Sequence, residues 1–165
     1  MRARKNNLKN FCAIVSSPFG AIGIRTAHDH VCQLVYLPPH TPTQLPRSPL
    51  TATVTEQLQH YFADPSYQFS LPLEKTGSLF RNKVWQAISA IPLGHTQTYG
   101  TLAQQIGSAP RAVGQACGDN PFPLIIPCHR VVAKNGLGGF AHTHTAGYQQ
   151  DAKRWLLTHE SALAA

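Results

Sequence analysis

Cys128, His129 and Arg130 follow one another in the stretch "LIIPCHRVV", between apolar residues. A thiol, an imidazole and a guanidinium side by side could form a satisfied polar cluster in a core strand. Alternatively, the thiol could be a nucleophile. A free cysteine has a pKa of about 8.5 and is mostly protonated at neutral pH, so a nucleophilic Cys128 needs a base.

His129 could take the proton of Cys128 directly or through a water, and it then needs a carboxylate that orients its ring. Only three acidic residues follow Glu74: Asp119, Asp151 and Glu160. Glu160 lies in "WLLTHE" near the end of the chain and could fold back to His129. By residue type the constellation is Cys–His–Glu. The alternative is a buried structural cysteine beside a packed histidine.

The first half of the chain must supply a support for this cluster. Three short strands, joined by the turns "SSPFG" and "TAHDH", predict an antiparallel meander over residues 11–15, 21–25 and 31–37. After a proline-rich loop, one helix is predicted from apolar residues at helical spacing: Leu50, Val54, Leu58, Tyr61 and Phe62. Asp64-Pro65 ends that helix. "SYQFSLPL" (66–73) predicts a returning strand, and "EKTG" (74–77) predicts a linker.

The second half predicts mainly helices. Ser78 caps a helix whose apolar side carries Phe80, Val84, Trp85, Ile88 and Ile91. Thr98 caps "YGTLAQQI", and after Gly107 the next residue, Ser108, caps "PRAVGQACG". Two short helices with a tight turn between them have helix-turn-helix spacing. "LIIP" predicts an apolar strand before Cys128, and a last helix carries Tyr148, Ala152, Trp155, Leu156, His159 and Leu163.

The segment "RAVGQACGDNP" is unusually rich in small residues: Ala112, Gly114, Ala116 and Gly118. Glycine inside a helix costs up to about 1 kcal/mol relative to alanine, so two glycines need a reason. The helix backbone could approach the sugar edges of a DNA groove, or it could pack tightly against another helix. Arg111 places a cation at the positive end of the helix dipole, which a nearby phosphate or base stack would explain.

Bulk composition narrows the setting. The 165 residues suit one compact domain or two small ones. Fourteen Lys and Arg against seven acidic residues give a net charge of +7, which favours nucleic acid as a partner, although a soluble basic enzyme would also fit. No apolar run reaches membrane-spanning length, and the apolar part of "MRARKNNLKNFCAIV" is too short for a signal peptide. A cytoplasmic protein with free thiols is therefore expected.

Two groups of residues raise the question of a metal. Cys12, His28, His30 and Cys32 could hold zinc, but their spacing is not that of a zinc ribbon. His142 and His144 alternate with threonines, which is more typical of a solvated loop. No metal is predicted, and Cys117 is predicted to pack inside the small-residue helix.

Four stretches occur in the order found in one known family: "IPLGHTQTYG", "RAVGQACGDNP", "IPCHRVV" and "KRWLLTHE". The chain from about Ser78 to Glu160 thus resembles the O6-alkylguanine-DNA alkyltransferases, and "SSPFGAIGI" loosely resembles their amino-terminal hairpin. The resemblance implies an α+β fold, with an amino-terminal antiparallel-sheet domain (residues 1–75) and a winged-helix-like helix-turn-helix domain (76–165). It also implies a monomer, no cofactor, no membrane, and double-stranded DNA carrying alkylated guanine as the partner.

By position, the resemblance makes Cys128 the acceptor of an alkyl group from O6 of guanine, irreversibly and once per molecule. His129 is implied to act as its base through a water, and Glu160 to orient His129. Tyr99 is implied to donate a proton to the guanine leaving group. Asn120 is implied to brace the turn between the recognition helix and the acceptor strand.

The resemblance also implies residues that hold the DNA and the base. Arg111 enters the stack where the flipped base was. The other implied contacts are the helix residues Ala112 and Gly114, the main chain at Val131, and the pocket residues Phe140 and Ala141. The chain departs from the family in "FAHTHTAGYQQ" (140–150), where Phe140 and Ala141 replace a tyrosine and a serine and the loop is longer. This loop is expected to form one wall of the base pocket, so the preferred alkyl group and the activity on O4 of thymine stay open.

Two other functions stay open. A non-catalytic module could bind alkylated bases, but relatives of that kind replace the acceptor cysteine, and Cys128 is present here. A cysteine hydrolase could use the same Cys–His–Glu set with turnover, and it would need neither Arg111 nor the glycine-rich helix.

Overall fold

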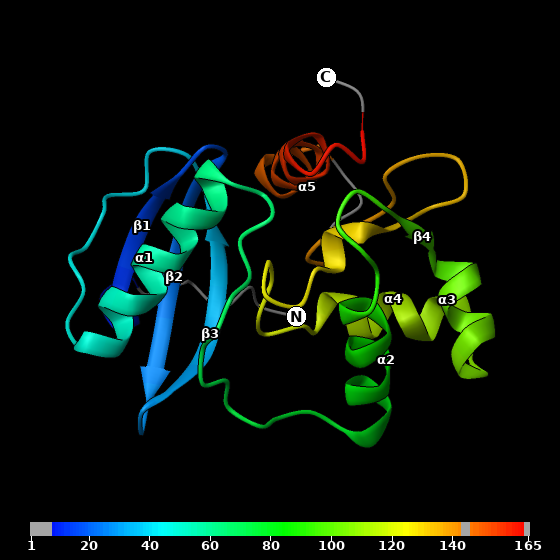
Figure 1. Cartoon of the computed structure of the whole chain (residues 1–165), viewed down its shortest axis with the longest axis horizontal. Helices are drawn as coiled ribbons and strands as arrows, with labels where there is room; N and C mark the ends of the chain where they lie inside the picture. Colours follow the sequence, from blue (N-terminus) through cyan, green and yellow to red (C-terminus); the bar gives the residue numbers. More distant parts are fainter. Residues whose placement is uncertain (1–7, 143–145, 164–165) are drawn as a thin grey trace.

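A three-stranded antiparallel sheet covered by one helix forms the left half of the molecule in Figure 1. The computed structural model describes residues 8–142 and 146–163. After a short 3-10 turn (η1, Leu8–Asn10), the sheet runs in the order β1 (Ala13–Ser17), β2 (Gly20–Ala27) and β3 (His30–Leu37). The predicted meander is confirmed, with strands one to three residues longer or shifted at their ends.

Helix α1 (Pro49–Ala63) covers this sheet because its apolar side meets β1 and β2. Ser48 caps it, since its side chain accepts a hydrogen bond from the backbone N–H of Thr51 at 3.1 Å. Val54 and Leu58 are fully buried against the sheet. The predicted helix is therefore confirmed, with Asp64 as its last cap.

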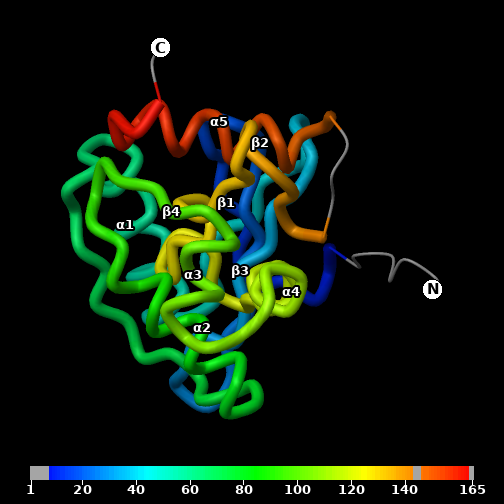
Figure 2. Tube along the Cα trace, turned by 90° about the vertical axis from the view of Figure 1, so that its right-hand side faces the viewer, coloured from blue at the N-terminus to red at the C-terminus, as the bar shows by residue number. Residues whose placement is uncertain are grey.

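The right half of the molecule is helical: α2 (Leu79–Ser89), α3 (Tyr99–Ile106) and α4 (Pro110–Gly118). Figure 2 shows these three helices together on the side turned toward the viewer, with the sheet behind them. The indole N–H of Trp85 on α2 donates to the carbonyl of Ala116 on α4 at 2.9 Å. Two parallel two-residue strands, β4 (Gln97–Thr98) and β5 (Val131–Val132), were not predicted.

The turn between α3 and α4 has the predicted helix-turn-helix form, with one correction. Gly107 has a φ of 68°, and the N–H of Ser108 bonds the carbonyl of Ala103 at 2.9 Å, which satisfies the end of α3. The prediction that Ser108 caps α4 is wrong, because Ala109 is the cap and has no side-chain bond. Pro110 forces Ala109 into an extended conformation, so Ala109 is the cap, and the helix begins at Pro110 as predicted.

The strand predicted at "LIIP" is also wrong. This segment makes a turn in which Leu124 has a φ of 75° and the N–H of Ile126 bonds the carbonyl of Phe122 at 2.9 Å. Prolines at 121, 123 and 127 lack the N–H groups that a strand ladder needs. A 3-10 turn, η2 (Cys128–Arg130), follows, so the reactive stretch lies in a tight turn and not in a strand.

Two further boundaries differ from prediction. Residues 66–73 form no strand, because Gln57 bonds both main-chain groups of Ser70 through its side chain and only Leu73 bridges to Val31. The last helix, α5 (Tyr148–His159), ends before Leu163, since Ser161 has a φ of 59° and the N–H of Ala162 bonds back to Leu157.

The two halves are joined along β3 and beneath α5, which lies above them in Figure 1. The N–H of Leu34 on β3 donates to the carbonyl of Pro121 at 2.9 Å. Trp155 on α5 packs against Phe19 and Phe62 of the sheet half, with ring centroids 5.6 and 6.0 Å apart. The reactive turn η2 is thus held between the sheet and the helices. In the described part of the chain, no helix is long and apolar enough to cross a membrane.

Candidate active site

The thiol of Cys128 lies between two cavities. The larger, of about 460 Å³, is bounded by α4, by Tyr99 and by residues 139–142. The smaller, of about 210 Å³, reaches from Cys128 toward β3. Cys128 is only 4% exposed, so a reagent must enter a cavity to reach it.

The buried thiol of Cys128 is protonated at rest. Burial raises its pKa well above the ordinary value, and neighbouring Cys117 raises it further. The side-chain amide of Asn120 and the ammonium of Lys153 act in the opposite direction. Asn120 donates to the Cys128 sulfur at 3.0 Å and to the carbonyl of Ile126 at 2.9 Å, while its oxygen accepts from the N–H of Phe122. One amide therefore fixes the turn and contacts the thiol.

His129 has the protonation state that a base requires. Its Nε2 lies 2.9 Å from a carboxylate oxygen of Glu160, and because that oxygen can only accept, Nε2 carries the hydrogen. Nδ1 is left with its lone pair, and it is buried with no hydrogen-bond partner among the described residues. Burial lowers the pKa of His129, although Glu160 opposes this effect, so the ring is neutral near pH 7 and able to accept a proton.

Glu160 is the centre of a buried hydrogen-bond network. Arg130 donates to both of its oxygens, at 2.9 Å each, and Tyr61 on α1 donates at 2.8 Å. Burial alone would raise the pKa of Glu160, but the hydrogen bonds from His129 and Arg130 outweigh it and hold the pKa well below its usual range. Arg130 is itself fixed by the carbonyl of Ile91 at 2.7 Å. Arg130 thus holds the carboxylate of Glu160, and Glu160 in turn holds the imidazole of His129.

A buried lysine closes the other side of the site. Lys153 on α5 is fully buried and donates to the carbonyls of Val131 and Gly139 at 2.8 and 3.0 Å. Burial lowers its pKa to about 8. Tyr99 donates to the same Gly139 carbonyl at 3.0 Å, and burial raises the pKa of its hydroxyl, which therefore stays protonated.

The two glycines of α4 have different surroundings. A Cβ on Gly114 would meet nothing within 4 Å, whereas a Cβ on Gly118 would collide with the ring of His142 at 2.3 Å. His142 bonds Asp119 at 2.9 Å, and Asp119 also pairs with Arg81 at 2.7 Å. Gly118 therefore serves packing, whereas Gly114 leaves an open surface at the mouth of the larger cavity.

Comparison with known proteins assigns the chain to a family. The sequence model described as "6-O-methylguanine DNA methyltransferase, DNA binding domain" matches residues 79–162, about half of the chain. The constitutive methylated-DNA–protein-cysteine methyltransferase of Bacillus subtilis is 43% identical over 120 residues, which are 72% of this chain and 70% of that protein.

The chain belongs to the 6-O-methylguanine DNA methyltransferase family. Its structure also resembles that of the Mycobacterium tuberculosis O6-methylguanine methyltransferase, with a TM-score of 0.74, 33% identity and coverage of 92% of this chain and 93% of the other. A crystal structure of the M. tuberculosis protein in complex with DNA has a TM-score of 0.73 and 35% identity, covering 90% of this chain and 91% of the other. The α+β fold expected from sequence is confirmed.

This family member brings most of its predicted pocket residues together. Arg111, Gly114, Phe140 and Ala141 line the larger cavity with Tyr99 and Cys128. Ala112 and Val131 do not line either cavity. The main-chain groups of Val131 are engaged by Cys128 and Lys153, so its contact with the base stays a prediction.

Sequence reasoning missed three residues of the site in this methyltransferase-family chain: Tyr36, Tyr61 and Lys153. It noted Arg130 beside His129 without giving it a role. Arg130 and Lys153 lie within quoted motifs, "IPCHRVV" and "KRWLLTHE", and a charged residue beside an apolar run was the available signal. Tyr36 and Tyr61 come from the sheet half, and no local pattern links them to Cys128.

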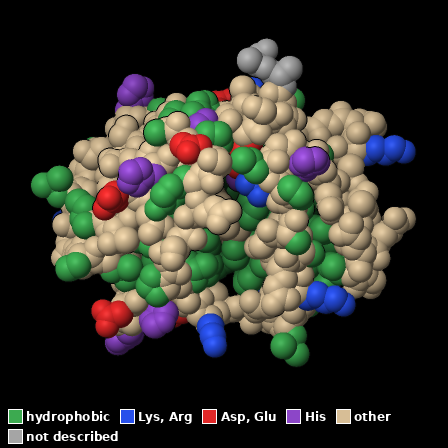
Figure 3. Space-filling model, in the orientation of Figure 1, with side chains coloured by type: hydrophobic (Ala, Val, Ile, Leu, Met, Phe, Trp, Pro, Cys, Tyr) green, Lys and Arg blue, Asp and Glu red, His purple; other side chains and the backbone are tan. Residues whose placement is uncertain are grey.

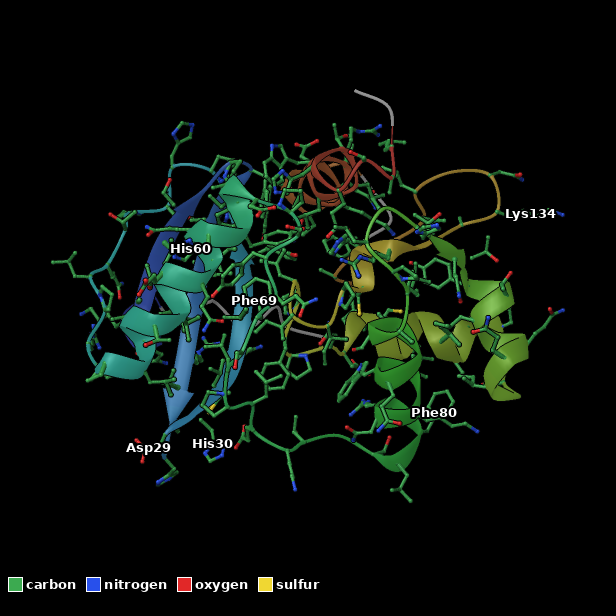
Figure 4. All side chains as sticks on the ribbon, in the orientation of Figure 1. Asp29, His30, His60, Phe69, Phe80 and Lys134 are labelled. Atoms are coloured by element: carbon green, nitrogen blue, oxygen red, sulfur yellow. The ribbon has the colours of Figure 1, made fainter. Side chains whose placement is uncertain are left out.

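The candidate zinc ligands of the amino-terminal part do not form a cluster. Cys12 donates to the carbonyl of Thr26 and Cys32 to that of His30. In Figure 4, His30 and Asp29 lie at the β2–β3 turn, away from Phe80 and Lys134 of the helical half. No group of three or more His, Cys, Asp or Glu side chains able to hold a metal is found among residues 8–142 and 146–163. His144 lies outside the described residues.

Proposed function

We propose that this chain repairs alkylated DNA by transferring the alkyl group from O6 of guanine to its own Cys128, once per molecule. The observation that carries this proposal is a buried thiol at the wall of a cavity of about 460 Å³ beside a neutral histidine that is held by a carboxylate. The names of the B. subtilis and M. tuberculosis relatives support the same activity.

The proposed chemistry uses the site groups in turn. Cys128 loses its proton to Nδ1 of His129, through a water that would also satisfy this unpartnered nitrogen. The thiolate attacks the alkyl carbon, a carbon–sulfur bond forms, and the electron pair of the breaking carbon–oxygen bond passes to the guanine. Tyr99 protonates the leaving purine and regains a proton from His129. The thioether is inert, so the protein acts once.

A guanine inside a duplex must leave the base stack to reach Cys128. Arg111 is exposed at the mouth of the larger cavity and makes no hydrogen bond or ion pair with any other described residue. The bare surface at Gly114 allows the backbone of α4 to approach a DNA groove. On the face shown in Figure 3, Lys and Arg side chains lie mainly over the helical half and Asp and Glu mainly over the sheet half.

The intact mass of the protein after incubation with methylated duplex DNA tests the proposal. A gain of one methyl group, located at Cys128 by peptide mapping, is the expected result. Binding without a gain would favour a non-catalytic DNA-binding module. A substrate hydrolysed repeatedly, without a gain in mass, would favour a cysteine hydrolase.

Arg111→Ala should slow repair of duplex DNA about tenfold or more, while transfer from a free alkylated guanine base changes little. Flipping costs a few kcal/mol, and an inserted side chain offsets part of it only when there is a stack to fill. Single-turnover kinetics on both substrates measure this difference. Arg111→Lys, which keeps the charge without the planar guanidinium, separates stacking from phosphate attraction. Equal losses on both substrates would mean that Arg111 is structural.

Three broader proposals accompany this function. The chain divides into an amino-terminal domain at residues 1–75 and a DNA-binding and catalytic domain at residues 76–165, which the family match over residues 79–162 supports. The protein acts as a monomer on double-stranded DNA. It works in the cytoplasm, where thiols such as Cys128 stay reduced.

A further inference from the structure

The smaller cavity places part of the amino-terminal sheet beside the acceptor thiol. It has a volume of about 210 Å³, and its wall includes Leu34, Tyr36, Pro123, Cys128 and Phe140. Because Cys128 lines both cavities, a group attached to its sulfur has access to the space on the β3 side as well as to the larger cavity.

Tyr36 carries an unused polar atom in this wall. The residue is only 7% exposed, and its hydroxyl is buried without a hydrogen-bond partner among the described residues. Buried hydroxyl groups are normally paired, so an unpaired one beside a cavity indicates a partner that enters the cavity.

The hydroxyl of Tyr36 is held in place. Its ring packs between those of Phe19 and Phe140, with centroids 5.5 and 5.4 Å away. The strand that carries it is tied to the helical half through the bond from Leu34 to the carbonyl of Pro121. The side chain therefore has no room to turn its hydroxyl toward solvent.

The surroundings also keep this hydroxyl protonated. Burial raises the pKa of Tyr36 well above its ordinary value, and its neighbours Cys128 and Glu160 raise it further. The side-chain amide of Asn120, another polar group of this wall, is already engaged by Ile126, Cys128 and Phe122. Tyr36 is thus a hydrogen-bond donor with no assigned acceptor.

We propose that the smaller cavity receives the part of the alkyl group beyond the attacked carbon, and that Tyr36 selects short alkyl groups bearing a hydrogen-bond acceptor, such as 2-hydroxyethyl. This inference rests on the proposed function. In an in-line displacement, the sulfur, the carbon and the guanine oxygen are collinear, so the rest of the alkyl group projects sideways from that line. The cavity beside the sulfur is where such a tail fits.

The test compares two tails of equal length that differ in one group. Single-turnover rates are measured on duplexes carrying O6-(2-hydroxyethyl)guanine or O6-propylguanine, each relative to O6-methylguanine with the same protein variant. The native protein should prefer hydroxyethyl over propyl. Tyr36→Phe, which removes only the hydroxyl, should lower this preference about tenfold, the effect of losing roughly 1.4 kcal/mol.

Tyr67→Phe is the matched control, since Tyr67 stacks on His60 away from the cavities and its change should leave the preference as it was. Thermal unfolding checks that each variant is folded. An unchanged hydroxyethyl-to-propyl ratio in Tyr36→Phe would overturn this inference. Failure of the native protein to accept even a methyl group would overturn the proposed function instead, so the two failures are distinguishable.

Discussion

Replacing Cys128 by serine is expected to abolish alkyl transfer while DNA binding is retained. A serine hydroxyl is far more basic than a thiol, and the neutral His129 held by Glu160 cannot remove its proton to a useful extent. Loss of the nucleophile from a catalytic triad costs about 10⁶-fold in rate, so no transfer should be detectable within an ordinary assay. The intact mass of the variant, after incubation with methylated duplex DNA, gives the measurement.

Cys32→Ser is the control for this experiment, because Cys32 is a partly buried free thiol on β3 that lines neither cavity. It should gain one methyl group as the native protein does. A methyl gain by Cys128→Ser would contradict the assignment of the acceptor. If peptide mapping then located the group at Cys117, the second thiol of both cavities would be the acceptor instead.

Glu160→Gln should lower both stability and transfer. The carboxylate is 3% exposed and accepts bonds from His129, Arg130 and Tyr61, and removing one partner of a buried ion pair costs about 3–5 kcal/mol. Transfer should fall about 10²–10⁴-fold, the usual share of general acid–base catalysis, because His129 loses the charge that supports its protonation. Urea unfolding and single-turnover rates measure the two effects.

Asp151→Asn is the matched control, since Asp151 is an exposed carboxylate on the same helix. Its change should alter stability by no more than about 0.5 kcal/mol. If Glu160→Gln changed stability as little as Asp151→Asn, the hydrogen-bond network of Glu160 would contribute nothing to the stability of the fold, contrary to what its burial predicts.

Native stability should also fall in acid, and the direction follows from two pKa shifts. The pKa of His129 is lowered on folding, so its contribution is lost as pH falls below about 6.5, the unfolded value. The pKa of Glu160 is held well below its usual range, so its contribution is complete above about pH 4.3 and is lost as pH falls further. In Glu160→Gln the loss of stability below about pH 4.3, which comes from the Glu160 carboxylate, should disappear.

The sequence predicted the elements that depend on local patterns. The strands β1 to β3 and the helices α1 to α5 follow from alternation, helical spacing and caps such as Ser48, Ser78 and Thr98. The pairing of His129 with Glu160 was also predictable, because carboxylates are scarce in the second half. Quoted motifs then identified the family from the same residues.

The remaining features depend on contacts that no short window contains. The bond from Tyr61 to Glu160 joins residues 99 positions apart, and Tyr36 meets the site only after the two halves are assembled. The turn before Cys128 was missed because its apolar composition resembles a strand, although prolines remove the N–H groups for pairing. These features therefore depend on long-range packing, which the hydrophobic periodicity of a short segment does not reveal.

The bond from Tyr61 to Glu160 has a consequence for exchanging parts between relatives. A chimera that joined the carboxy-terminal half of this chain to a foreign amino-terminal half without a donor at this position would leave one oxygen of the buried carboxylate with the bond from Arg130 alone. Such a hybrid would bind DNA through the helices of its carboxy-terminal half, but it would hold His129, the proposed general base, loosely. The two halves are therefore interchangeable only as a matched set, with tyrosine and glutamate inherited together.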